Sequence, residues 1–360
     1  MHEFSIFIEN PGHTLRGILF CIGLLALGIW LLAKGGNFLV TGGLGLAKQL
    51  NIKTMLVGLT IIAFSTSSPE LAFNIFAASG GSGEITVGNI FGSIIANLAL
   101  VLGVGALVHN AVRRKKGEEE ATPIHRDFLE KEGCWLIYST IGISIIVGAI
   151  ILLGNSKDSY FNLNIGIGGI VFIFFILFFW HVIIKHKSSN DKEEEEPNNN
   201  CSLSKAIFLL TGGFILLIVG GKSAEIGAVS GARIIGLSEM FIGVTIVAIA
   251  TSLPELVTTI VAAKRDKPDL IWGNIVGSNL FNILFVLPIT LIVAYFYVGF
   301  IDIPTTYEPW FYMGVMLIVT LVAWNSMKKD EDITNIEGYS LVGIYFVFLI
   351  TATILKMVFV

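Results

Sequence analysis

The sequence has little charge for its length. Only 14% of its 360 residues are Asp, Glu, Lys or Arg, against about 25% in an ordinary soluble domain, whereas 54% are hydrophobic. A soluble protein of this size needs charged surface over two or three cores, so a soluble enzyme is disfavoured. The 23 Lys and Arg against 27 Asp and Glu give a net charge of −4, which leaves no broad basic face for nucleic acid.

Cysteine is also scarce. The three cysteines, Cys21, Cys134 and Cys201, are scattered and lack metal-ligand spacing. Cys21 falls inside an apolar run, where cysteine usually acts as a small buried hydrophobe. The cysteines therefore indicate neither a disulfide framework nor a zinc site, and no bound cofactor is expected.

Long apolar runs dominate the sequence. A helix that crosses a bilayer needs about 20 mainly apolar residues. Ten such runs are present, at about 15–34, 55–79, 86–108, 134–154, 164–184, 206–221, 240–263, 270–297, 309–325 and 339–360. The first and sixth runs continue into glycine-rich stretches, so these two helices are expected to extend further. The sequence predicts an all-α polytopic membrane protein with ten transmembrane helices.

Basic residues predict the orientation. The odd-numbered connections hold 17 Lys and Arg residues, whereas the even-numbered connections and both termini hold 4. Because positive loops stay in the cytoplasm, we expect both termini to be extracellular or periplasmic. The charged stretches 117–131 and 187–200 are expected to be solvated linkers.

An internal repeat divides the chain. Residues 58–102 match residues 243–287 without a gap at an offset of 185, with 20 of 45 positions identical, and the match extends to about 35–102 and 220–287. Five predicted helices separate the two copies, and an odd number inverts the second copy in the membrane. We therefore expect two inverted five-helix halves, 1–186 and 203–360, joined by a cytoplasmic linker at 187–202. Inverted repeats are typical of secondary transporters, whose sites lie near the bilayer midplane.

Each copy carries Thr-Ser-x-Pro-Glu inside an apolar run, ending at Glu70 and Glu255. A carboxylate within a membrane helix is costly and needs a partner, a cation or water. Because proline lacks an N–H group, Pro69 and Pro254 leave backbone carbonyls unpaired and kink the helix. The motif therefore places a carboxylate beside freed carbonyl oxygens.

The next helix of each copy carries Gly-Asn-x-x-Gly-Ser-x-x-x-Asn, at 88–97 and 273–282. Asn89, Ser93 and Asn97 step by four and form one polar stripe, and the glycines permit close helix approach. A single serine, threonine or asparagine in a membrane helix more often bonds to its own or a neighbouring helix. Two glutamates in the same duplicated setting favour a binding site instead.

Two carboxylates, hydroxyls, amide oxygens and freed carbonyls together make an all-oxygen site. Such ligands suit a hard cation, and calcium takes 6–8 oxygens in flexible geometry. A charge of −2 is neutralised by one Ca²⁺, by two Na⁺ or by two protons. The same oxygens can therefore bind competing ions in turn, as exchange requires.

At these motifs the sequence resembles the calcium/cation antiporter (CaCA) superfamily, and within it the Na⁺/Ca²⁺ exchangers. TSSPE with GNIFGSIIAN and TSLPE with GNIVGSNLFN are similar to its two α-repeats. The resemblance implies a five-plus-five inverted fold and alternating access, with the first and sixth helices sliding against the remaining bundle. Asn282 stands where the K⁺-dependent branch has Asp, which argues against potassium co-transport. Ser65 and Ala250 replace the usual glycine before Thr-Ser, and Ile94 replaces a usual asparagine.

By position, the resemblance implies two sets of ligands. For Ca²⁺ they are the side chains of Glu70 and Glu255 and the carbonyls of Thr66 and Thr251. For Na⁺ they are the carbonyls of Ala63 and Ala248, the hydroxyls of Ser67, Ser93, Ser252 and Ser278, and the side chains of Asn97 and Asn282.

The resulting hypothesis is an antiporter, not an enzyme, that exchanges Ca²⁺ for Na⁺ by alternating access in the plasma (cell inner) membrane. Its partners are the two transported ions and the lipid bilayer. An H⁺/Ca²⁺ antiporter of the same fold is the first alternative, and a cation channel or a non-transporting scaffold is the second. Stoichiometry and oligomeric state stay open.

Overall fold

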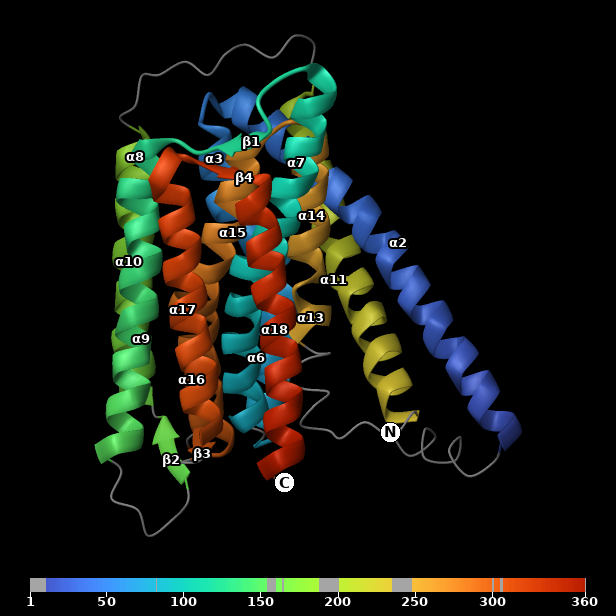
Figure 1. Cartoon of the computed structure of the whole chain (residues 1–360), viewed down its shortest axis with the longest axis vertical. Helices are drawn as coiled ribbons and strands as arrows, with labels where there is room; N and C mark the ends of the chain where they lie inside the picture. The colour runs from blue at the N-terminus through green and yellow to red at the C-terminus, as the bar shows by residue number, and fades with distance from the viewer. Residues whose placement is uncertain are drawn as a thin grey trace.

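The computed structural model describes residues 11–81, 83–153, 160–163, 165–187, 201–234, 248–299, 301–304 and 307–359. The chain is predominantly helical, which confirms the predicted class (Figure 1). Among these residues, seven helices are long and apolar enough to cross a membrane: Leu15–Leu50, Thr54–Ser79, Thr86–Lys116, Leu203–Ala224, Pro268–Tyr297, Glu308–Asp330 and Asn335–Leu355. Gly166–Val182 is a shorter apolar helix.

The elements follow one another in similar order in the two parts of the chain. Those before residue 188 are α2 (Pro11–Leu50), α3 (Thr54–Val57), η1 (Gly58–Ile62), α4 (Ala63–Thr66), α5 (Ser68–Ser79), α6 (Gly83–Ile95), η2 (Ala96–Val101), α7 (Leu102–Lys116), β1 (Ala121–Pro123), α8 (Arg126–Phe128), η3 (Leu129–Gly133), α9 (Cys134–Leu153), β2 (Tyr160–Leu163) and α10 (Ile165–Lys187). Those after residue 200 are α11 (Leu203–Ile234), α13 (Ala248–Thr251), α14 (Leu253–Lys264), α15 (Pro268–Phe281), η5 (Asn282–Val286), α16 (Leu287–Tyr297), β3 (Ile301–Pro304), α17 (Tyr307–Asp330), β4 (Asp332–Thr334) and α18 (Asn335–Phe359). The η elements are π-helical turns within longer helices.

The first and sixth predicted helices do extend through their glycine-rich stretches, as α2 and α11. The prediction for 117–131 was wrong, because this stretch contains β1, α8 and η3, and Thr122 is fully buried. The run of glutamates in this stretch predicted a solvated linker, although the residues that follow the run are packed. The predicted residues 240–247 and 188–200 fall outside the described part of the chain.

Two small antiparallel sheets close opposite ends of the bundle. Strand β1 pairs with β4 at one end, and β2 pairs with β3 at the other (Figure 1). Each sheet takes one strand from before residue 188 and one from after residue 200. The sheets therefore tie the two parts of the chain together at both ends.

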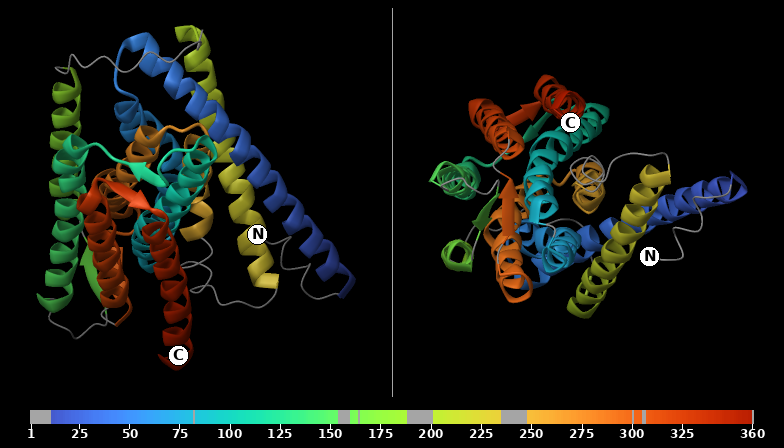
Figure 2. Two further views of the ribbon diagram at one scale, coloured as in Figure 1. Left: turned by 45° about the horizontal axis from the view of Figure 1, so that its top comes forward. Right: turned by 90° about the horizontal axis from the view of Figure 1, so that it is seen from below.

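Helices α2 and α11 pack along each other at one side of the bundle (Figures 1 and 2). Glycines bring their backbones together: a Cβ atom on Gly28 would lie 2.5 Å from the Ala224 nitrogen and 2.7 Å from the Gly220 carbonyl oxygen. A Cβ atom on Gly213 would lie 2.9 Å from the carbonyl oxygen of Gly35. Stripes of small residues permit this close approach between membrane helices.

Contacts between the two parts recur at the offset of the sequence repeat. Gly42 lies against Ala206 and Leu210, and 185 residues on Gly227 lies against Cys21 and Leu25. Helix α14 is the equivalent of α5 in the second copy, and α7 is the equivalent of α16 in the first. Accordingly, α5 packs on α16 and α14 packs on α7. The two copies of the repeat thus use equivalent surfaces against each other.

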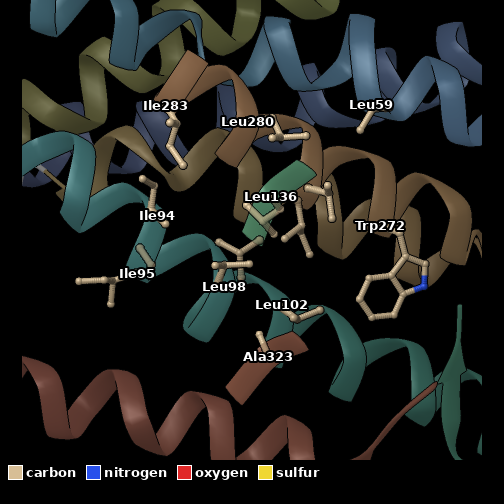
Figure 3. Close-up of a cluster of buried hydrophobic side chains, with 14 of the residues drawn as sticks. Leu59, Ile94, Ile95, Leu98, Leu102, Leu136, Trp272, Leu280, Ile283 and Ala323 are labelled. Carbon is tan, nitrogen blue, oxygen red and sulfur yellow. The ribbon is translucent and has the colours of Figure 1, made fainter. Parts of the chain in front are cut away.

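The main apolar core lies among η1, α6, η2, α7, α9, α15 and α17 (Figure 3). Leu98, Leu136 and Leu280 are buried there, and Trp272 donates a hydrogen bond of 2.6 Å to the Pro123 carbonyl. Large apolar side chains also cover the outside, where Phe296 is 75% exposed. An apolar exterior suits lipid better than water.

A polar cluster of Asp266, His109 and Lys116 holds the turn between α14 and α15 against α7. The Asp266 carboxylate lies 2.8 Å from Nε2 of the buried His109 and 2.5 Å from the Lys116 ammonium. Burial raises the pKa of the Asp266 carboxyl, but the hydrogen bonds and charges of Lys116 and His109 outweigh it and leave the pKa below its ordinary value. The ionised carboxylate therefore stabilises this turn.

Replacing Asp266 with Asn is expected to lower the stability in detergent at neutral pH by about 1–3 kcal/mol, because charge-assisted hydrogen bonds are lost. Asn suits the residue's positive φ of 55°, so the change tests the charge. Since the folded pKa is lowered, the stabilisation is present above the unfolded pKa of about 3.9 and is lost as pH falls through the folded pKa. Thermal unfolding should be measured from about pH 8 to about pH 3.5. The difference in stability between Asp266→Asn and the unmodified protein should shrink only below about pH 4.

Asp127→Asn is the matched control. Asp127 pairs with Lys131 at 2.8 Å but is 84% exposed, so its loss should change the unfolding temperature little. An Asp266→Asn penalty that stayed constant down to the acid end of this range would show that the charge of Asp266 does not stabilise the turn.

Candidate cation site

Two matching helix breaks carry the predicted carboxylates. Helix α4 ends before Ser67 and α5 begins after it, whereas Ser252 separates α13 from α14. Ser67 has φ −83° and ψ 4°, and Ser252 has φ −84° and ψ 2°. Pro69 and Pro254 follow two residues later and cannot donate to the preceding turn. The repeated sequence therefore produces the same local kink twice.

Glu70 and Glu255 are both 0% exposed, and the carboxyl group of Glu255 is close enough to act electrostatically on that of Glu70. The hydroxyl of Ser67 donates to Glu255 Oε1 at 2.9 Å, across the two breaks. Glu255 Oε2 and both carboxylate oxygens of Glu70 have no hydrogen-bond partner among the described residues. A buried carboxylate in this condition is strongly destabilising without a positive charge beside it.

Each break also contacts the Gly-Asn helix of the other copy. Thr66 Oγ1 lies 3.1 Å from Asn274 Oδ1 and 3.2 Å from Ser278 Oγ. Thr251 Oγ1 donates to Asn89 Oδ1 at 3.3 Å. The Thr66–Asn274 and Thr251–Asn89 contacts are the same contact at the offset of 185. The predicted ligand positions Thr66, Ser278, Ser67, Glu255 and Thr251 are thus linked across the two copies.

Asn97 and Asn282 lie in the π-helical turns η2 and η5. Such turns occur often at functional sites, because the extra residue frees backbone groups and re-aims a side chain. The remaining predicted side chains share complete or nearly complete burial and the absence of a hydrogen-bond partner among the described residues: Ser93 Oγ, Ser252 Oγ, and both polar atoms of Asn97 and of Asn282. They are oriented by packing and carry unused oxygens.

Two predicted carbonyl ligands differ from this pattern. The Ala63 carbonyl accepts hydrogen bonds from the Thr66 hydroxyl at 3.1 Å and from the Ser67 N–H at 3.0 Å, so a cation there would compete with two donors. Ala248 is the first residue of α13, and its side chain lies outside the described part. The structure does not bring the Ala248 carbonyl into any described contact with the other predicted ligands.

Glycine allows the surrounding helices to approach the breaks. A Cβ atom on Gly277 would lie 2.6 Å from the Leu59 carbonyl oxygen, and one on Gly273 would lie 2.7 Å from the Leu59 nitrogen. Helix α15 therefore packs backbone to backbone on η1, as its motif predicted. Gly221 of α11 faces both breaks, since its Cβ atom would lie 3.6 Å from Cγ of Pro69 and from Cγ of Pro254.

The sequence did not identify two polar positions beside the site. Asn74 and Thr259 lie one helical turn beyond Glu70 and Glu255, and both are fully buried. They occupy equivalent positions at the offset of 185, but their side chains differ, so identity between the copies gave no signal. Burial and hydrogen bonding reveal them.

The profile of the family described as sodium/calcium exchanger protein matches residues 20–189 and 205–354. A putative antiporter, CaxA, of Alkalimonas amylolytica is 30% identical over 311 residues, which cover 86% of this chain and 92% of that protein. The sodium/calcium exchanger MaX1 of Methanosarcina acetivorans is 28% identical over 355 residues, covering 91% and 97%.

A solved structure of the sodium-calcium exchanger NCX_Mj, soaked with Na⁺ and Sr²⁺, is similar to this fold. Its TM-score is 0.72, with 26% sequence identity over 92% of this chain and 98% of that chain. The residues matched by the family profile include both breaks and both Gly-Asn helices.

Proposed function

This chain belongs to the sodium/calcium exchanger protein family, and from that premise we propose that it expels or takes up Ca²⁺ in exchange for Na⁺ by alternating access. It is a multi-pass membrane cation antiporter by family. The observation that carries the proposal is the pair of buried carboxylates, Glu70 and Glu255, set at matching helix breaks with three oxygens lacking a partner among the described residues.

The proposed architecture has ten transmembrane helices in two inverted halves, 1–186 and 203–360, with both termini outside and a cytoplasmic linker at 187–202. The reciprocal contacts at an offset of 185, such as Thr66–Asn274 with Thr251–Asn89, support this arrangement. The excess of basic residues in alternate connections supports the orientation. The plasma (cell inner) membrane is the proposed location.

We assign the Ca²⁺ ligands to the side chains of Glu70 and Glu255 and to the carbonyls of Thr66 and Thr251. The Na⁺ ligands are the carbonyls of Ala63 and Ala248, the hydroxyls of Ser67, Ser93, Ser252 and Ser278, and the side chains of Asn97 and Asn282. Among the described side-chain groups, the unpartnered oxygens of Glu70, Glu255, Ser93, Ser252, Asn97 and Asn282 support these roles.

The charge of the site favours exchange over simple passage. An empty site exposes two uncompensated carboxylates to a low-dielectric interior, and this raises the free energy of the occluded intermediate. One Ca²⁺, two Na⁺ or two protons remove the charge of −2, so only a site that carries such a charge crosses the barrier readily. A single site that must always be loaded couples efflux of one ion to influx of the other.

The coupling ion is tested in proteoliposomes with Na⁺, K⁺ and H⁺ gradients imposed one at a time. The proposal predicts ⁴⁵Ca²⁺ uptake driven by an outward Na⁺ gradient, with no dependence on K⁺, because Asn282 supplies an amide in place of a carboxylate. Uptake driven by a pH gradient without Na⁺ would identify an H⁺/Ca²⁺ antiporter. Currents far above carrier rates would identify a channel, and no movement of ions would identify a scaffold.

A further inference from the structure

Asn74 lies on the same face of α5 as Glu70. Besides Ser68 at its start, the buried residues of this helix are Glu70, Asn74 and Ala78, which follow one another at intervals of four. Residues four apart on a helix have neighbouring side chains, with Cβ atoms about 6 Å apart. The Asn74 side chain is therefore one turn from the Glu70 carboxylate, on the side toward Ser79.

Asn74 is fully buried, and neither its amide oxygen nor its amide nitrogen has a hydrogen-bond partner among the described residues. The same holds for Nδ2 of the buried Asn89 in the next helix, whose Oδ1 accepts from Thr251. An unpaired buried amide is costly, so a water molecule or an ion usually satisfies it. The Asn74 amide lies one helical turn from the Glu70 carboxylate, whose two oxygens also lack a partner among the described residues.

In the second copy, the side chains at the equivalent positions are hydrogen-bonded to each other. Thr259, the equivalent of Asn74, accepts a hydrogen bond of 3.0 Å from Asn274 Nδ2, and Asn274 also donates to the Glu255 carbonyl at 3.3 Å. Asn274 is the equivalent of Asn89, so the Nδ2 group that lacks a partner among the described residues in the first copy links α15 to α14 in the second. The two sides of the site differ in which polar groups are available to an ion.

We propose that Asn74 is a further cation ligand, whose amide oxygen forms with the Glu70 carboxylate an outer subsite for Ca²⁺ or Na⁺. Amide and carboxylate oxygens are hard ligands, and ligand distances of 2.3–2.6 Å on each side of a Ca²⁺ ion are compatible with side chains one turn apart. The Nδ2 group of Asn74 donates to water that remains on the ion.

The subsite rests on the proposed function for its role, and on the proposed topology for its direction. Helix α5 runs from the break toward the outer face in that topology, so an ion reaches the subsite from outside before it reaches the center of the site. The equivalent positions toward the cytoplasmic side, Thr259 and Asn274, are hydrogen-bonded to each other, and the polar group beside them that lacks a partner among the described residues is the hydroxyl of Thr258 rather than an amide. The effect of Asn74 on affinity is therefore expected on one side only.

Three replacements of Asn74 test the proposal in right-side-out and inverted vesicles. Asn74→Leu keeps the size but removes both polar groups, and is expected to raise the external Ca²⁺ concentration for half-maximal transport about tenfold. Asn74→Asp adds a carboxylate and is expected to lower that concentration. Asn74→Thr introduces the residue that stands at the equivalent position of the second copy, and it should raise the half-maximal concentration as Asn74→Leu does. The internal half-saturating concentration should stay near that of the unmodified protein for all three.

Phe76→Leu is the matched control, because Phe76 lies on the same helix but is 73% exposed. Opposite shifts for Asn74→Asp and Asn74→Leu cannot arise from misfolding alone. External affinities for Asn74→Leu and Asn74→Asp equal to those of the control would overturn the proposal, as would equal shifts on both sides.

A binding measurement separates this proposal from the proposed function. Calcium should raise the thermal unfolding temperature of the detergent-solubilised protein, with a midpoint concentration that Asn74→Asp lowers and Asn74→Leu raises. If the unmodified protein binds Ca²⁺ in this way but does not exchange it for Na⁺, the proposed function fails while the subsite stands. If exchange occurs and these midpoints do not move, the subsite fails.

Discussion

Replacing Glu70 or Glu255 with Gln is expected to reduce Na⁺-driven Ca²⁺ uptake by about two to three orders of magnitude, the cost of removing one partner from a buried ionic cluster. Glutamine has the same shape but no charge, so the site retains a charge of −1 and no longer compensates the dehydration of a divalent ion. Initial rates of ⁴⁵Ca²⁺ uptake in proteoliposomes measure the loss. Glu130→Gln, at an exposed carboxylate that pairs with Arg126, should leave the rate unchanged.

The same variants should be more stable than the unmodified protein when no cation is present. Removing an uncompensated buried charge lowers the free energy of the folded state. Glu70→Gln should stabilise more than Glu255→Gln, because the Ser67 hydroxyl donates to Glu255 at 2.9 Å, whereas the equivalent Ser252 hydroxyl approaches Glu70 without completing a hydrogen bond. Both variants should lose the stabilisation by Ca²⁺. Loss of uptake together with lower stability would point to misfolding, and unchanged uptake would exclude the glutamates as ligands.

Adding a side chain at the α2–α11 crossing is expected to reduce turnover about tenfold or more, the equivalent of the 1–3 kcal/mol that overpacking typically costs. In Gly28→Val, the new Cβ atom would lie 2.5 Å from the Ala224 nitrogen, so the two helices must separate. If α2 and α11 slide together past Pro69 and Pro254, separating them impairs the motion but leaves the ligands in place. Transport should therefore fall while Ca²⁺ binding in detergent persists.

Gly23→Val is the control for the crossing. Gly23 lies on the same helix, and a Cβ atom there would have no atom of the described residues within 4 Å. Equal transport by the two variants would contradict a role for the close crossing in the transport cycle. Loss of Ca²⁺ binding in Gly28→Val would show that the crossing shapes the site itself.

The repeat made most of the helical architecture predictable. Its apolar runs and the recurrence of the Thr-Ser-x-Pro-Glu motif located the helices and both breaks, since a proline inside an apolar helix has a direct steric consequence. The glycine-rich extension of α2 was expected, although hydropathy ended at residue 34, because glycine at regular spacing serves helix packing.

Long-range pairing was not predictable from local pattern. Strand β1 follows a run of glutamates that indicated a solvated linker, and it forms only because β4, more than two hundred residues away, supplies its hydrogen bonds. The π-helical turns at Asn97 and Asn282 have no propensity signature, and tertiary packing decides them.

For the site, the sequence identified the residue types but not their partners. It placed Asn89 on a polar stripe and Asn274 at the matching motif position, whereas the structure shows that these side chains contact Thr251 and Thr66 of the opposite copy. Asn74 carried no motif at all, since its importance rests on missing hydrogen bonds rather than on spacing.

The most direct test is anomalous diffraction from crystals grown with Ca²⁺ and then transferred to high Na⁺ without Ca²⁺. We predict one strong calcium peak within bonding distance of carboxylate oxygens from both Glu70 and Glu255, and its disappearance in Na⁺. A calcium peak elsewhere, or one held by a single glutamate and unaffected by Na⁺, would show that the two glutamates do not form a shared exchange site.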